Sequence, residues 1–287
     1  MPIFLRSALI AVALVCFLPA QVHAGLCTPG PSTLCLQGDR FQVTVDWENG
    51  MNSGQGIVLL QSSNNFGFFR YTDPQTAEVL AQVSDGCTFN GNYWVQLALL
   101  SDFGQTITVT DLNLGTQQQY FVTEGSHSQP VIDLGSFPCT APFNPPLDAP
   151  AELAQRGQEL LLFDGRFRVD VTWEANGGAT GDGQPTQLLD RAGYFTFFGS
   201  NPELVVKMVP GTAGGFHTFV ASAIGSSAIE MTVTDLCSGD VQVYNQPINN
   251  TITIVDDQAF PVECPVIFAD GFESGGLLAW SSAVGAL

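Results

Sequence analysis

Hydrophobic and polar residues alternate along several short segments of this chain. In residues 40–48, Phe41, Val43, Val45 and Trp47 alternate with Arg40, Gln42, Thr44 and Asp46. Successive side chains of a β-strand point to opposite faces, so this period of two predicts a strand with one buried and one solvated face. Residues 106–110 alternate in the same way with threonines on one side, and β-branched residues favour strands.

The same pattern occurs a second time, at an offset of about 126 residues. Residues 40–48 match residues 166–174, where Phe167, Val169, Val171 and Trp173 take the apolar positions. Further matches set residues 66–69 against 195–198, Glu78 against Glu203, and residues 108–112 against 232–236. A duplicated unit of about a hundred residues has the size of one β-sandwich domain.

Turn-forming clusters separate these strand patterns at short intervals. Asn49-Gly50, Asp85-Gly86 and Asn90-Gly91 are examples, and such pairs are typical of tight turns between strands. The spacing predicts about seven strands in each copy, without strand–helix–strand units. We therefore predict an all-β protein with two tandem antiparallel β-sandwich domains, either immunoglobulin-like or jelly-roll-like.

The first residues predict export. An apolar run over residues 8–20 follows Arg6 and leads to Val22-His23-Ala24, the pattern of a signal peptide cleaved after Ala24. The run is shorter than the roughly 20 residues of a membrane helix, so we expect no membrane span. The predicted organisation is a signal peptide (1–24), a first sandwich (25–139), a proline-rich linker (140–158), a second sandwich (159–264) and a C-terminal tail (265–287).

The charge of the chain narrows the classes of partner. There are 27 acidic and 8 basic residues, and the formal net charge is −19. A surface of this kind repels nucleic acid and anionic lipid, so we expect neither as a partner. Acidic residues keep an exported protein soluble, and they can also collect divalent cations.

The cysteines predict disulfide bonds. Export and an even number of cysteines after cleavage favour disulfides over metal or redox chemistry. Leu161 and Thr212 stand in the second copy at the positions of Cys35 and Cys87, so we predict that these two cysteines, which lack counterparts together, bond to each other. The predicted pairs are Cys35–Cys87, Cys27–Cys139 and Cys237–Cys264.

Several spaced motifs resemble an extracellular bacterial module that occurs singly or repeated in secreted proteins. The motifs are Arg40-Phe41-x-Val-x-Val-x-Trp47, Gly54-x-Gly56, Asp85-Gly86-Cys87, Asn90-Gly91-x-x-Trp94-Val95 and Thr108-Val-Thr-Asp111. The second copy matches more loosely, with Phe219 in place of Trp94 and two cysteines fewer. The resemblance implies export and a β-rich accessory role, and it carries over no functional residues.

The end of the chain resembles a second kind of signal. Residues 268–275 read Phe-Ala-Asp-Gly-Phe-Glu-Ser-Gly and precede Trp280. This is similar to a short C-terminal tail of many exported bacterial proteins, and to the opening strand of lectin-like jelly rolls. The segment is thus either a recognition tag or an edge strand or loose end, as chain termini commonly are.

Candidate catalytic residues are few. No nucleophile motif accompanies His127 or His217, so we expect both histidines on the surface or in loops. A glycosidase-like pair could be drawn from the recurring carboxylates Asp46, Glu48, Asp85, Asp111, Asp170, Glu174 and Asp235. We instead expect Asp111 and Asp235 to open turns through hydrogen bonds from the backbone to their side chains.

No cofactor motif is present, and calcium is the one candidate metal. It would use Asp182 beside Gly181 and Gly183, or Asp270 with Glu273, although neither group has the ligand density of an EF-hand loop. A set of aromatic residues fits alternate core positions better than a sugar-stacking platform: Phe66, Phe68, Phe69, Tyr194, Phe195, Phe197 and Phe198.

Together these patterns predict a secreted, non-enzymatic pair of modules with a binding or structural role at or outside the cell surface. The expected partner is an extracellular glycan or protein. Two alternatives stay open: an extracellular hydrolase of polysaccharide or protein that uses surface carboxylates, and a calcium-stabilised adhesin.

Overall fold

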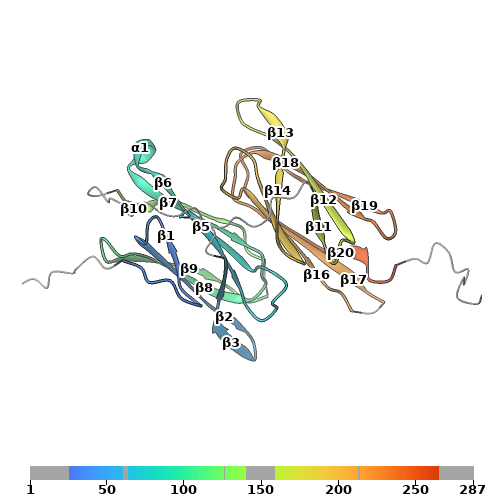
Figure 1. Cartoon of the computed structure of the whole chain (residues 1–287), viewed down its shortest axis with the longest axis horizontal. Coiled ribbons are helices and arrows are strands. Elements are labelled where there is room, and N and C mark those ends of the chain that lie inside the picture. Colours follow the sequence, from blue (N-terminus) through green and yellow to red (C-terminus); the bar gives the residue numbers. More distant parts are fainter. Residues whose placement is uncertain (1–25, 61–63, 126, 140–158, 213, 265–287) are drawn as a thin grey trace, which may run out of the picture.

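The computed structural model describes residues 26–60, 64–125, 127–139, 159–212 and 214–264. These residues form four antiparallel sheets, so the all-β class is confirmed (Figure 1). Within the described part of the chain, no helix has the length and apolarity that crossing a membrane requires. The predicted signal peptide, linker and tail lie outside the described residues.

Two facing sheets make up the N-terminal sandwich, residues 34–138. One sheet has the order β1-β2-β8-β9, with β3 paired to β2, and the other has the order β10-β7-β6-β5-β4. The elements are β1 (Leu34–Leu36), β2 (Phe41–Asn49), β3 (Asn52–Gln55), β4 (Ile57–Leu60), β5 (Phe66–Arg70), β6 (Val79–Gly86), the one-turn helix α1 (Cys87–Asn90), β7 (Asn92–Leu99), β8 (Gly104–Asp111), β9 (Thr116–Val122) and β10 (Val131–Pro138).

The C-terminal sandwich, residues 160–261, has the same two strand orders. Its sheets are β11-β12-β18-β19, with β13 paired to β12, and β14-β15-β16-β17-β20. The strands are β11 (Leu160–Leu162), β12 (Phe167–Glu174), β13 (Thr180–Asp182), β14 (Gln184–Leu189), β15 (Ala192–Thr196), β16 (Leu204–Val209), β17 (Phe216–Ala223), β18 (Ala228–Asp235), β19 (Val241–Gln246) and β20 (Thr253–Pro261).

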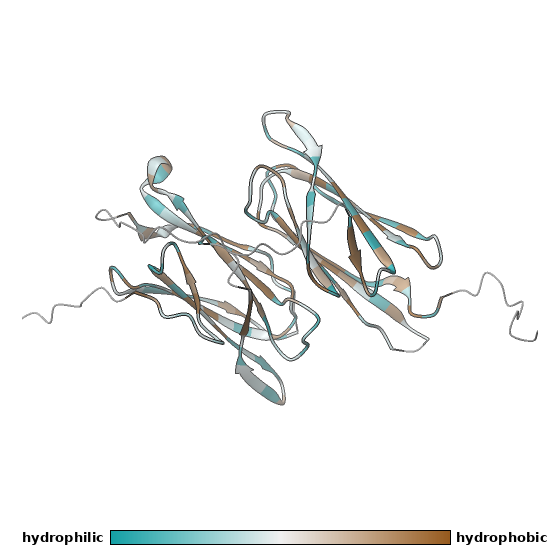
Figure 2. Ribbon diagram, in the orientation of Figure 1, coloured by the Kyte–Doolittle hydropathy of each residue, from teal (hydrophilic) through white to brown (hydrophobic). Residues whose placement is uncertain are grey.

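The central strands bury alternate residues, as their pattern predicts. On β2, Phe41, Val43 and Val45 are buried, and Phe41 lies opposite Asp111 of β8. On β12, Phe167 lies opposite Asp235 of β18, so the two sheets share one register. Hydrophobic residues gather in the strands, where they alternate with hydrophilic ones (Figure 2).

The structure corrects two matches between the halves. Phe219 of β17 lies opposite Asp256 as Val95 of β7 lies opposite Asp133, so Phe219 is equivalent to Val95 and not to Trp94.

The second correction concerns Phe66. The backbone oxygen of Phe69 accepts the Glu78 amide, and that of Phe195 accepts the Glu203 amide, so Phe69 is equivalent to Phe195. The match of Phe66 with Phe195 is therefore wrong by three residues. Because an odd shift exchanges the faces of a strand, the true equivalence places Phe69 and Phe195 in the sandwich cores and leaves Phe68 and its equivalent Tyr194 on the outer faces.

Those outer faces pack the two sandwiches against each other. A buried cluster joins Phe66, Phe68, Ala77, Leu80, Ala98 and Leu100 to Ala192, Tyr194, Val205, Val220 and Ile224. The rings of the equivalent residues Phe68 and Tyr194 stack with centroids 5.4 Å apart, and contact between equivalent residues is a mark of two-fold symmetry. In Figure 1 the β2–β3 and β12–β13 hairpins accordingly project in opposite directions.

Charged residues complete this interface. The buried Nζ of Lys207 lies 2.7 Å from Oε2 of Glu78, and Arg191 pairs with Asp73 at 2.8 Å. The equivalent position of the N-terminal sandwich has no lysine. In the sheets, Gln82 lies opposite Phe66 as Lys207 lies opposite Ala192, so Gln82 takes the place of Lys207 and the symmetry of the charges is broken. Glu203, the equivalent of Glu78, pairs with no cation among the described residues, and burial raises its pKa to about 7.

Two of the three predicted disulfide pairs are wrong. The bonds are Cys27–Cys35, Cys87–Cys139 and Cys237–Cys264, and only the last was predicted. Cys35 lies on β1 of one sheet, whereas Cys87 follows β6 of the other. The Cys139 amide donates to the oxygen of Gly91 just beyond α1, at 2.8 Å, and this holds Cys139 beside Cys87.

Candidate functional site

A groove opens on the N-terminal sandwich where β3 folds back along the end of β2. Its volume is ≈ 620 Å³. Asp46, Glu48 and Trp47 of β2 line it together with residues of β3, β8 and β9 and the segment that follows β9: Ser53, Gly54, Gln55, Gly104, Gln105, Thr106, Phe121, Val122, Thr123 and Glu124. We call this hollow the Trp47 groove.

Packing around Trp47 shapes the groove. A Cβ on Gly54 would lie 3.0 Å from Cζ2 of Trp47, so a glycine at position 54 lets β3 lie on the indole. The Trp47 ring also stacks on Tyr71 with centroids 5.6 Å apart. Trp47 is therefore a packing residue, and the open aromatic ring of the groove is Phe121, which is 73% exposed.

Negatively charged hydrogen-bond acceptors line the groove. Asp46 and Glu48 are exposed on β2, and Glu124 is exposed beyond β9. None of these three carboxylates forms a salt bridge within the described residues, and no basic side chain lines the groove. Carboxylates only accept hydrogen bonds, so the groove suits a ligand rich in hydroxyl or other donor groups.

Two buried donors beside the groove have no acceptor in the described part of the chain. They are Nε1 of Trp47 and Nε2 of Gln105. The other end of the Gln105 amide accepts a hydrogen bond from the Tyr71 hydroxyl. An unpaired buried donor costs about 1–3 kcal/mol, so this corner of the core is polar and incompletely satisfied.

The equivalent hollow of the C-terminal sandwich is smaller and differently lined. This Trp173 groove has a volume of ≈ 390 Å³ and is lined by Glu174, Asp182, Glu230 and Asn245, among others. Nε1 of Trp173 donates to the backbone oxygen of Asp182 at 3.3 Å. Asn245 lies opposite Glu230 as Phe121 lies opposite Thr106, so this groove has an asparagine at the position of Phe121.

The hydrogen bond from the Tyr71 hydroxyl to Gln105 distinguishes the N-terminal sandwich from the C-terminal one, and substitutions can test it. Phe197 stacks on Trp173 as Tyr71 stacks on Trp47, and Ile229 is the register equivalent of Gln105. Tyr71→Phe should lower the free energy of unfolding by about 1–3 kcal/mol, because it leaves the whole buried Gln105 amide unpaired. Adding Gln105→Ile should restore most of that loss, as measured by denaturant unfolding in a double-mutant cycle; additive losses would contradict the hydrogen bond.

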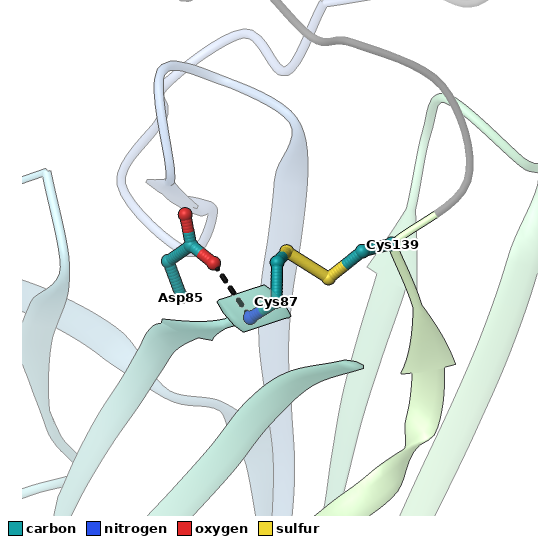
Figure 3. A group of neighbouring side chains, drawn as sticks. All are labelled: Asp85, Cys87 and Cys139. Carbon is teal, nitrogen blue, oxygen red and sulfur yellow. Dashed lines mark hydrogen bonds between the residues drawn. A yellow bond between two sulfur atoms is a disulfide. The ribbon is translucent and has the colours of Figure 1, made fainter. Parts of the chain in front are cut away.

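The calcium candidates are spread over different parts of the chain. Asp182 is exposed in the Trp173 groove, and Asp270 and Glu273 lie outside the described residues. Among described residues, the one close group of potential ligands is Asp85, Cys87 and Cys139 (Figure 3). Its two cysteines are bonded to each other and Asp85 accepts the Cys87 amide at 2.8 Å, so no free thiolate is present, and calcium binding stays a prediction.

Asp111 and Asp235 open turns, as predicted. Asp111 accepts the Asn113 amide and Asp235 accepts the Cys237 amide, each at 2.9 Å. Each aspartate is also fully buried against an arginine that sequence reasoning missed. Nη2 of Arg40 lies 2.6 Å from Asp111, and Arg40 is 1% exposed rather than solvated; Nη2 of Arg166 lies 2.8 Å from Asp235.

These ion pairs change what the two aspartates can do. Burial opposes ionisation of Asp235, but hydrogen bonds from Arg166 and the Cys237 amide lower its pKa below the usual value. A buried, paired carboxylate cannot contact a polymer substrate. The surface pair that a hydrolase needs would therefore have to come from other carboxylates, such as Asp46 and Glu48.

His217 is buried, which corrects the expectation of a surface histidine. It is 2% exposed, and its Nε2 lies 3.3 Å from Nη1 of Arg166, beside the rings of Phe163 and Phe167. Burial and the charge of Arg166 lower its pKa, so the ring is neutral at neutral pH. The alternation along β17 points it inward, at a position equivalent to Tyr93.

His127 lies in a second kind of hollow, between the sandwiches. This cavity has a volume of ≈ 280 Å³, and Asp73, Glu78, Arg191 and Lys207 are among its lining residues. Burial lowers the pKa of His127. Both cations of the cavity already pair with carboxylates, so neither is free to bind an incoming anion.

Comparisons with protein-family models, with curated proteins and with solved structures found no match to this chain. The grooves therefore have to be judged by their own chemistry. Sequence reasoning singled out Asp46 and Glu48 but missed Phe121 and Glu124. A signal for Phe121 exists in the alternation of β9, which places this ring on the solvated face.

Proposed function

We propose that this protein is a non-enzymatic, extracellular binding protein whose Trp47 groove holds a hydroxyl-rich glycan. The observation that carries the proposal is the pairing, in one open groove, of unpaired carboxylates with an exposed aromatic ring. Sugar hydroxyls donate to carboxylates, and the apolar face of a sugar ring covers an aromatic ring. Binding sites typically combine apolar surface with a few convergent polar groups in this way.

An extracellular location is supported by the three disulfides, which persist in oxidising compartments. The predicted signal peptide points in the same direction. The acidic groove also favours neutral or cationic ligands over anionic ones, because negative charges of ligand and groove repel each other.

Binding to a panel of soluble neutral and anionic polysaccharides, followed by calorimetry, tests the proposal. Phe121→Ala and Glu48→Gln should each weaken binding of a neutral polysaccharide by about tenfold or more. The matched variants Asn245→Ala and Glu174→Gln, which change the Trp173 groove, should leave binding within about twofold. Equal losses from both grooves, or no binding across the panel, would refute the assignment.

A further inference from the structure

The outer face of the sheet β1-β2-β8-β9 continues the Trp47 groove along the strands. Two rows of residues lie beside the groove, and each row crosses β2, β8 and β9. The first row is Thr44, Thr108 and Gln119, and the second is Gln42, Thr110 and Gln117. All six side chains are exposed or half-buried and none is charged. We call these six residues the polar face. The polar face meets the groove at the next row along the strands, which consists of Asp46, Thr106 and Phe121.

The equivalent face of the C-terminal sandwich does carry charged residues. The equivalent positions of the C-terminal sandwich hold Asp170, Thr232 and Val243, then Arg168, Thr234 and Val241. There Arg168 and Asp170 form an exposed ion pair at 2.9 Å, and the two valines are 52% and 51% exposed. On a chain of net charge −19, the polar face is thus a distinct surface of hydroxyls and amides.

We propose that the polar face and the Trp47 groove form one continuous track that binds a neutral polysaccharide chain. This inference rests on the proposed function and specifies its ligand as a polymer segment. From Asp46 to Gln42 the strand advances by about 14 Å, and three strands span about 10 Å. The track is therefore longer than a single sugar ring and wide enough to lie under one chain.

The chemistry of the track matches an uncharged polymer. Hydroxyl and amide groups both donate and accept hydrogen bonds, as do the hydroxyls of a sugar. The side-chain amide of Gln119 is already held in place, since its Nε2 donates to Oγ1 of Thr108 at 3.2 Å. A uronic acid polymer would bring its carboxylates against Asp46, Glu48 and Glu124, so the groove selects against anionic chains.

A peptide strand is the competing occupant. β9 ends its sheet, and an added strand would bind its backbone edge rather than the polar face. The Tyr120 hydroxyl on β9 donates to Asp133 of β10 at 2.7 Å, which ties this edge to the opposite sheet. Side chains of the polar face would contribute little to a peptide bound at the edge, so variants of the face separate the two occupants.

The test compares oligosaccharides of increasing length. The neutral polysaccharide that binds best to the full chain, among β-glucan, α-glucan, xylan and mannan, supplies its disaccharide and hexasaccharide for calorimetry. The variant Thr108→Val/Thr110→Val removes two hydroxyls with little change in shape or strand preference. It should weaken hexasaccharide binding by about tenfold and leave disaccharide binding within twofold. The matched variant Thr232→Val/Thr234→Val should change neither.

The outcomes distinguish this inference from the function on which it rests. Stronger binding of the hexasaccharide, lost in Thr108→Val/Thr110→Val alone, supports the track. Equal binding of both lengths with no effect of the variant overturns the track and leaves the groove as a site for a short sugar. Absence of any polysaccharide binding, or binding of peptides insensitive to the variant, overturns both proposals.

Discussion

Replacing Arg40 with methionine should lower the free energy of unfolding by about 3–5 kcal/mol, because it leaves the carboxylate of Asp111 buried without its cation. Arg40 also lies over the ring of Tyr93, with its Cζ 4.4 Å from the ring centroid. The guanidinium therefore links the two sheets of the N-terminal sandwich. Denaturant unfolding followed by tryptophan fluorescence would measure the loss.

An exposed pair in the same protein is the control for this substitution. Arg168 and Asp170 have side chains 37% and 51% exposed, and exposed pairs contribute at most about 1 kcal/mol. Arg168→Met should therefore change stability by less than about 1 kcal/mol. If Arg40→Met cost no more than Arg168→Met, the buried pair described for Asp111 would be wrong.

Removing the Cys87–Cys139 disulfide by a double substitution to alanine should cost about 4 kcal/mol by loop entropy, since the bond closes a separation of 52 residues. The bond also anchors α1 against the end of β10. Removing Cys27–Cys35 in the same way should cost less, about 2.5 kcal/mol, because it closes a separation of only 8 residues.

Peptide mapping without reduction and thermal unfolding would check this result. Mapping should recover peptides that join Cys87 to Cys139 and Cys27 to Cys35. Recovery of a Cys35–Cys87 peptide would overturn the connectivity. Equal stability losses for the two double substitutions would show instead that loop length does not govern the contribution of these bonds.

The strands could be predicted from the sequence because the alternation of apolar and polar residues determines them. Alternation at residues 40–48 and 166–174 places apolar side chains on one face, and burial of that face needs a second sheet. The equivalence of Phe66 with Phe195 failed because composition alone matched two phenylalanine-rich segments. Only the backbone bonds from Glu78 and Glu203 show which face each ring occupies.

Arg40 shows where alternation stops being a guide. It precedes β2, and it follows Gln37, Gly38 and Asp39, all of which have positive φ. The direction of its side chain is set by this turn rather than by the strand. The disulfide pairs failed for a similar reason, because equivalence between two halves says nothing about which sulfurs the loops bring together.

The Trp47 groove was only partly predictable. Asp46 and Glu48 follow from alternation on β2, whereas the hollow itself depends on how β3 folds across the strand end. Gly54 marks that contact, since its lack of a side chain accommodates the indole. From the sequence, however, Gly54 is one of several glycines in turn-rich segments, and nothing local distinguishes it.

Lys207 is the only lysine of the chain, and the interface buries it at 5% exposure. Reagents that modify primary amines should therefore label the Lys207 side chain only when the two sandwiches move apart, so the rate of its labelling would report opening of the interface.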